Sequence, residues 1–131
     1  MSLFKPRTVV FAHCDLPCGV YDPAQARIEA QSVLAMQEKY QGNEDPVFRT
    51  RAVTLIGERS ELVKHHLWVL WTDYFKPPHL EKYPNLHDLF WKATKAAGAG
   101  GTKGSVDPAT GKQLLDYIDQ ISEIFWETKK S

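Results

Sequence analysis

Three Asp-Pro dipeptides divide this chain of 131 residues, and they constrain its fold more than any other local feature. An aspartate at the N-cap accepts hydrogen bonds from backbone amides, and proline suits the first helical position because its missing N–H needs no partner there. Each dipeptide therefore predicts the start of a helix, and a further helix is predicted to begin at Pro84. The dipeptides are Asp22-Pro23, Asp45-Pro46 and Asp107-Pro108.

Helix ends and apolar spacing complete the fold prediction. Gly42-Asn43 ends the first helix, Pro77-Pro78 lies just beyond the second, and residues 98–104 close the third. Short connections favour antiparallel neighbours, so we expect an all-α fold, an antiparallel up-down four-helix bundle. Apolar residues at helical spacing predict the core faces of the second and last helices. They are Val53, Ile56, Val63, Leu67 and Leu70, and Leu114, Leu115, Ile118, Ile121, Ile124 and Phe125.

The composition excludes several classes of protein. At 131 residues the chain has room for a single domain. Its 16 basic residues balance 16 acidic residues, so no excess of positive charge is present to hold nucleic acid. No apolar run approaches the roughly 18 residues of a membrane-spanning helix, so we expect no membrane partner.

A histidine, both cysteines of the chain and a tyrosine gather just before the first predicted helix, in the segment HCDLPCGVY, residues 13–21. Asp15, Pro17 and Gly19 are residues typical of turns, so two buried thiols are a poor explanation of the segment. Two thiolates beside a histidine are ligands that late transition metals prefer. The segment therefore predicts a metal-binding site.

The stretch HCDLPCGVYDPAQARIEA, which begins at His13, resembles the amino-terminal nickel hook of nickel-containing superoxide dismutases. The blocks KHHLWVLWTDYFKPPHLEKYPNLH, residues 64–87, and DPATGKQLLDYIDQISEIFWETKK, residues 107–130, resemble the same family. The resemblance thus spans nearly everything from His13 onward. One difference is that the residues MSLFKPRTVVFA precede the histidine, which is the first residue in working members of the family.

The resemblance implies an enzyme that disproportionates superoxide to dioxygen and hydrogen peroxide by cycling one nickel ion per subunit between Ni(II) and Ni(III). It implies that His13, Cys14 and Cys18 bind the metal: the α-amine of His13, the backbone nitrogen of Cys14 and both sulfurs in a plane, with the His13 imidazole axial. An α-amine ligand requires a free amino terminus. We therefore expect residues 1–12 to be a pro-segment that a peptidase removes, leaving one domain, 13–131, and we expect the unprocessed chain to be inactive.

Other hook residues have expected roles. The resemblance implies that Tyr21 borders the substrate pocket, and Asp15, between the ligands, is expected to order the loop; both are our candidate catalytic residues. Each could instead be only a turn residue. Pro17 and Gly19 form the tight loop that returns Cys18 to the metal. The family also implies a homo-oligomer, a hexamer.

A Glu29–Arg59 contact is also expected. Both residues lie about 15 residues from the turn of the first helical hairpin, so at about 1.5 Å per residue they reach the same height. From spacing alone a solvated surface pair is an equally good explanation. The resemblance implies that the pair holds the hook histidine through its ring nitrogen.

The segment 1–12 bears on the cell compartment. It begins with basic residues and ends in Ala12, as a signal peptide does, but its apolar stretch covers only residues 8–12. A secretory signal needs about 7–15 apolar residues. We therefore expect a cytoplasmic protein, in which thiols stay reduced and serve as ligands.

Two hypotheses without catalysis stay open at the level of the sequence. One is a carrier of nickel, copper or zinc that uses Cys14, Cys18 and a histidine. The other is a redox-switch interaction protein in which the two cysteines form a disulfide. Neither needs a free amine at His13, so both should work with residues 1–12 attached.

The remaining histidines and two lysines are weaker candidates. His65 and His66 are adjacent on a predicted helix, so their side chains point about 100° apart and cannot chelate one metal together. A ligand role is not expected for two more histidines in or near the Pro-rich loop. Two lysines near that loop could attract superoxide or simply be solvated. These four residues are His79, His87, Lys76 and Lys82.

Overall fold

The computed structural model describes residues 18–130, which form helices and no strand. The predicted pro-segment 1–12 and the predicted hook residues His13, Cys14, Asp15 and Pro17 lie outside the described residues. The elements in chain order are α1 (Ala24–Gln41), α2 (Pro46–Val69), a π-helical turn η1 (Leu70–Tyr74), α3 (Pro77–Lys82), α4 (Leu86–Ala97), a 3₁₀ turn η2 (Thr102–Gly104) and α5 (Pro108–Lys130).

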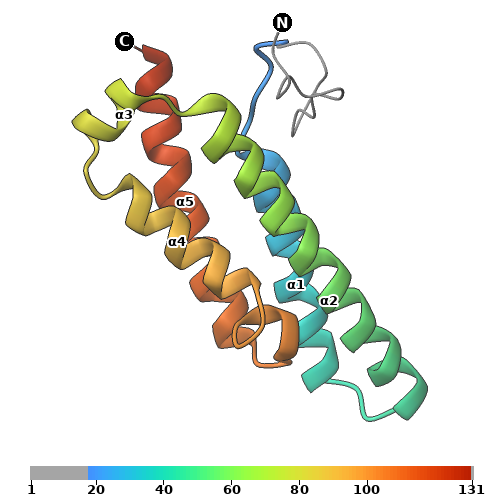
Figure 1. The fold of residues 1–131 in the computed structure, drawn as a ribbon. Helices are drawn as coiled ribbons and strands as arrows, with labels where there is room; N and C mark the ends of the chain where they lie inside the picture. The colour runs from blue at the N-terminus through green and yellow to red at the C-terminus, as the bar shows by residue number, and fades with distance from the viewer. Residues whose placement is uncertain (1–17, 131) are drawn as a thin grey trace, which may run out of the picture.

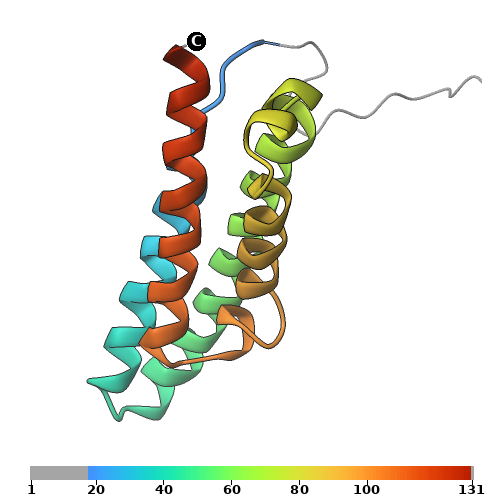
Figure 2. The ribbon, with the colours of Figure 1, turned by 90° about the vertical axis from the view of Figure 1, so that its left-hand side faces the viewer.

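Four long helices pack as the predicted antiparallel bundle (Figure 1). Helix α1 packs against α2 and α5, and α4 packs against the same two helices. Figure 2 shows the resulting arrangement, with α1 beside α5 and α2 beside α4. The beginning of α1, the end of α2 and the end of α5 lie at one end of the bundle. Residues 18–23 join the bundle at this end.

The Asp-Pro dipeptides start helices as predicted. The Asp45 carboxylate accepts a hydrogen bond from the Phe48 amide at 3.3 Å. Asp22 accepts from the Ala24 amide at 2.9 Å, and Asp107 accepts from the Ala109 amide at 3.0 Å. Carboxylates that satisfy free amides at a helix start stabilise it. Helix α1 begins at Ala24, within one residue of the predicted position.

The segment around Pro77-Pro78 was predicted to be a loop, and this prediction was wrong. It forms the short helix α3, and α4 begins at Leu86, two residues after Pro84. Proline occupies the first position of α3, and the Nδ1 atom of His79 accepts a hydrogen bond from the Lys76 amide at 3.0 Å. That contact serves as a cap and explains why six residues hold a helical conformation here.

The core faces are those predicted, with one exception. Val53 is 47 % exposed, because the buried stripe of α2 runs through Ala52 and Ile56 and leaves Val53 on the outer side of the helix. The predicted residues that are buried are Ile56, Val63, Leu67, Leu70, Leu114, Ile118, Ile121, Ile124 and Phe125, with Leu115 partly buried against them.

Helices α1 and α5 approach each other closely at Gly111. A Cβ atom added there would lie 3.1 Å from the Leu34 Cα and closer still to Oε1 of the buried Gln37. The Gln37 amide cannot move aside easily, because its nitrogen donates to the Thr110 hydroxyl at 2.8 Å and to the Ser105 carbonyl at 3.2 Å.

We therefore expect Gly111→Ala to lower the free energy of unfolding by about 1–3 kcal/mol through overpacking. Gly57 in α2 is the matched control, because a Cβ atom there meets nothing within 4 Å. Gly57→Ala should raise stability by about 0.5–1 kcal/mol, since alanine favours a helix interior. Urea unfolding measures both. Equal effects of the two substitutions would contradict the close approach.

Candidate metal centre

Cys18 is exposed and lies six residues before the start of α1 at Ala24. Gly19 follows it with a φ of 72°, a left-handed conformation that glycine adopts without strain, so the chain turns directly after the thiol. The turn places the Val20 amide 3.4 Å from the Cys18 sulfur, to which it donates. An N–H donor stabilises a thiolate, which is the form that binds metals.

This donor chemistry fits a soft or borderline metal such as nickel. The thiol is accessible, and its neighbouring amide favours the negative charge. Within residues 18–130, no three His, Cys, Asp or Glu side chains gather closely enough to hold a metal ion. A metal on Cys18 would therefore take its other ligands from the preceding residues. The roles of His13 and Cys14 stay predictions, because both residues lie outside the described part of the chain.

Tyr21 leads from the hook into the bundle. Its half-buried ring packs on the bundle, with its centroid 5.7 Å from that of Tyr74. Tyr74 ends the π-helical turn, in which the Phe75 amide donates to the Leu70 carbonyl at 3.0 Å. π-Turns are rare in proteins as a whole, but those that occur are often found at functional sites, where they change the direction of side chains. This turn directs Tyr74 toward α5, where its hydroxyl meets Thr128 at 2.7 Å.

Helices α3 and α5 complete the surroundings of Tyr74. The His79 ring stacks on Tyr74 with centroids 5.8 Å apart and planes 9° apart, and the Lys129 ammonium lies 5.1 Å from the Tyr74 centroid. His79 was predicted to lie in or near a loop, whereas it belongs to α3. No sequence pattern predicted this cluster, because its members come from three separate elements.

Glu29 and Arg59 form the predicted contact across the α1–α2 hairpin. The Arg59 Nη1 atom lies 3.1 Å from Glu29 Oε2 and 3.4 Å from Oε1. The Glu29 side chain is only 18 % exposed, so this pair is more shielded than an ordinary surface pair. The contact is confirmed, while its predicted role in holding His13 is not tested by these contacts.

The weaker candidates do not gather into a site. His65 and His66 lie on α2 with ring centroids 5.5 Å apart, and His87 lies on α4 against Trp71, also at 5.5 Å. The Lys76 ammonium donates to the Asp73 carbonyl at 3.1 Å. Lys82 lies near the ring of Tyr83, 5.6 Å from its centroid.

Tyr83 joins the turn after α3 to α5. Its hydroxyl donates to the Glu127 carboxylate at 2.8 Å, and this hydrogen bond raises the pKa of Tyr83. The contact anchors the segment before α4 onto the last turns of α5, near the residues that surround Tyr74.

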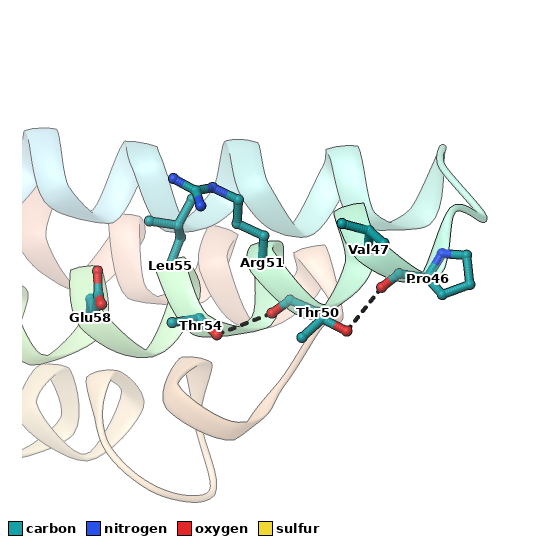
Figure 3. Close-up of a pocket in the computed structure, with 7 residues that line it drawn as sticks. All are labelled: Pro46, Val47, Thr50, Arg51, Thr54, Leu55 and Glu58. Carbon is teal, nitrogen blue, oxygen red and sulfur yellow. Dashed lines mark hydrogen bonds between the residues drawn. The ribbon is translucent and has the colours of Figure 1, made fainter.

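A surface hollow of about 610 Å³ lies on the first half of α2, lined by residues between Pro46 and Glu58 (Figure 3). The hydroxyls of Thr50 and Thr54 donate to carbonyls of their own helix at 2.9 and 3.1 Å. Arg51 and Glu58 supply the charged groups, and neither sulfur nor imidazole lines the hollow. It therefore offers nothing that suits a soft metal.

Within the described part of the chain, no helix has the length and apolar character to cross a membrane. An all-α bundle with an exposed thiol just before its first helix is the arrangement expected of a metalloprotein that binds its metal ahead of the bundle. A model of the family described as nickel-containing superoxide dismutase matches residues 8–129. The chain belongs to this family.

Individual relatives agree with the family assignment. The chain is 65 % identical over 129 residues to superoxide dismutase [Ni] of Streptomyces coelicolor, covering 98 % of this chain and 97 % of the relative. A native nickel superoxide dismutase structure is 66 % identical with a TM-score of 0.86, covering 91 % of this chain and all of that one. A structure described by nickel ligation corresponding to the oxidised state gives 64 % identity, a TM-score of 0.87 and the same coverage.

Proposed function

We propose that this chain, after removal of residues 1–12, disproportionates superoxide to dioxygen and hydrogen peroxide with nickel as its metal. The observation that carries the proposal is the family match across residues 8–129, together with an exposed thiol at the hook end of the bundle. Loading the chain that begins at His13 with nickel and following superoxide decay directly tests it. The two hypotheses without catalysis, a metal carrier and a redox-switch protein, are less well supported, because the match to the dismutase family covers nearly the whole chain.

The protein's residues have distinct parts in this chemistry. When bound, nickel supplies a one-electron couple between its +2 and +3 states. The sulfurs of Cys14 and Cys18 would hold the metal and, as anionic donors, would favour its more positive state. Tyr21 limits what reaches the hook, and Asp15 and Pro17 shape the loop between the ligands. Each turnover of two superoxide ions consumes two protons, so the proton-bearing groups near the hook matter.

Removal of residues 1–12 is supported by the coverage of the relatives. The match to the Streptomyces coelicolor enzyme covers 98 % of this chain. The match to the native nickel superoxide dismutase structure includes the whole of that chain but covers only 91 % of this one. The remaining 9 % of this chain is about 12 residues. A free amine at His13 would add a five-membered chelate with the Cys14 nitrogen, and a peptidase is needed to produce it.

We expect Glu29 and Arg59 to position the hook histidine. Glu29→Gln or Arg59→Met should lower turnover about 10- to 100-fold, the usual range for residues that orient metal ligands. Nickel content should fall less, since the predicted ligands remain. Stopped-flow superoxide decay and metal analysis measure the two quantities.

The control is the other α1 ion pair, in which the Arg27 Nε atom lies 2.8 Å from Asp119 of α5. Asp119→Asn removes an ion pair that joins α1 to α5, leaves the Glu29–Arg59 contact in place, and should leave turnover unchanged. If both Glu29→Gln and Arg59→Met kept full turnover, their contact would be structural only.

The proposal includes a cytoplasmic homohexamer. Large exposed apolar side chains support an assembly: Trp68, Trp91 and Trp126 are 43 %, 56 % and 47 % exposed. Trp68 and Trp91 also line one surface hollow, and contiguous exposed apolar surface marks contacts between proteins. The reduced cysteines that a metal site needs agree with the cytoplasm. Sedimentation equilibrium of the nickel-loaded protein tests the number of subunits.

A further inference from the structure

Helix α3 begins with a cap that depends on the protonation of one histidine. The Nδ1 atom of His79 accepts a hydrogen bond from the Lys76 amide at 3.0 Å. A neutral imidazole has one N–H and one acceptor nitrogen, so the ring hydrogen of His79 must lie on Nε2. A protonated imidazole carries a hydrogen on both nitrogens and can accept no hydrogen bond. The cap therefore exists only while His79 is neutral.

Few other contacts hold the start of this helix. Pro77 and Pro78 supply no N–H groups. The amides of His79 and Leu80 both donate to the Lys76 carbonyl, at 2.9 and 3.3 Å. Helices shorter than about 12 residues are marginal on their own. None of the six residues of α3 is buried, so packing against the bundle contributes little. The helix therefore depends strongly on its cap.

Charged groups lie on the elements next to His79, and within residues 18–130 no carboxylate forms an ion pair with it. The Lys129 ammonium of α5 lies 5.1 Å from the centroid of Tyr74, the ring on which His79 stacks. A cation in the first turn of a helix also opposes the macrodipole and destabilises the helix. A protonated His79 would thus find no carboxylate partner in the capped structure. The other charged residues of these elements are Asp73, Lys76, Glu81, Lys82 and Glu127.

We propose that His79 is a pH-sensitive cap for α3. When Nδ1 takes a proton, the Lys76 amide loses its acceptor and α3 uncoils. The capped helix excludes this proton and the uncoiled segment binds it, so the stability of α3 is lost as the pH falls through the range in which histidines titrate, about pH 8 to 5. Tyr74 then loses the ring that stacks on it, while Tyr21 packs on the same tyrosine.

The test follows helix α3 in the full chain with no metal added. Backbone 13Cα chemical shifts of residues 77–82, measured by NMR, report the balance between helical and uncoiled conformations. The ratio of uncoiled to helical α3 should rise about 2- to 30-fold from pH 8 to pH 5, the range for the loss of one N-cap. A ratio that is the same at both pH values would overturn the proposal.

His79→Gln is the matched variant. A glutamine at the third helical position can accept from the N-cap amide, as in a capping box, and does not titrate. The ratio should therefore be the same at pH 8 and pH 5 in this variant. The variant keeps the other four histidines of the chain. An acid response that persisted in it would show that another group is responsible, and would overturn the proposal.

Two further measurements examine the cap itself. His79→Leu has no acceptor, so its ratio of uncoiled to helical α3 should be raised at both pH values; a ratio equal to that of the parent at pH 8 would show that α3 needs no cap. The ring 15N shifts of His79 in the parent at pH 8 should show a hydrogen on Nε2 and none on Nδ1. A hydrogen on Nδ1 would overturn the proposal. None of these measurements uses nickel or superoxide, so their outcome does not depend on dismutase activity.

Discussion

Replacing Cys18 by serine should abolish nickel-dependent dismutation in the chain that begins at His13, with an expected loss beyond about 100-fold. Losing a residue that only orients a ligand costs about 10- to 100-fold, so losing a ligand should cost more. Serine has nearly the shape of cysteine, but its hydroxyl is a harder donor that does not ionise near neutral pH. Stopped-flow superoxide decay measures the loss, and metal analysis follows the nickel content.

Val20→Ala is the matched control for this substitution. The Val20 side chain is 70 % exposed, and the contact with Cys18 comes from the Val20 amide, which alanine keeps. We expect near-normal activity in this variant. Nickel-dependent turnover that survived in Cys18→Ser would show that the metal does not depend on this thiol.

The second large effect concerns the amino terminus. The full chain should show no nickel-dependent dismutation above background, and cleavage after Ala12 should produce it. With Ala12 attached, the His13 nitrogen is a peptide amide, so the amine–amide chelate is lost although every side chain remains. Superoxide decay by the full and the cleaved chains measures the effect.

A variant that keeps only Ala12 in front of His13 is the sharpest control. It differs from the cleaved chain by a single small residue and should be as inactive as the full chain. Thiols alone can still hold some nickel, so metal content is not the readout. Activity equal to that of the cleaved chain would contradict the amine ligand, and the carrier hypothesis would then be preferred.

The parts of the fold that the sequence predicted are those with local causes. An N-cap carboxylate and a first-position proline act within four residues, so Asp45 and Pro46 mark the start of α2 correctly. Helix α3 and the π-turn at Leu70–Tyr74 were not predicted. Their stability depends on packing against other elements, which a periodic pattern does not record.

The site, too, has features with local causes, which could be predicted, and features that depend on distant residues, which could not. The motif around Cys18 is contiguous, so its chemistry could be read directly from the sequence. The Glu29–Arg59 contact was predictable because a hairpin relates residues by their distance from the turn. Tyr74 and Thr128 are 54 residues apart and meet only because the π-turn redirects one of them toward α5. A tyrosine or a threonine in a sequence does not by itself predict which distant residue it will contact.

The most direct test of the account is superoxide decay catalysed by the chain that begins at His13, loaded with nickel and freed of other metals. We expect one nickel per chain and catalytic decay that persists over many turnovers and disappears when nickel is withheld. A chain that bound one nickel through its thiols, yet consumed superoxide no faster than the metal-free protein, would contradict the dismutase and favour a carrier.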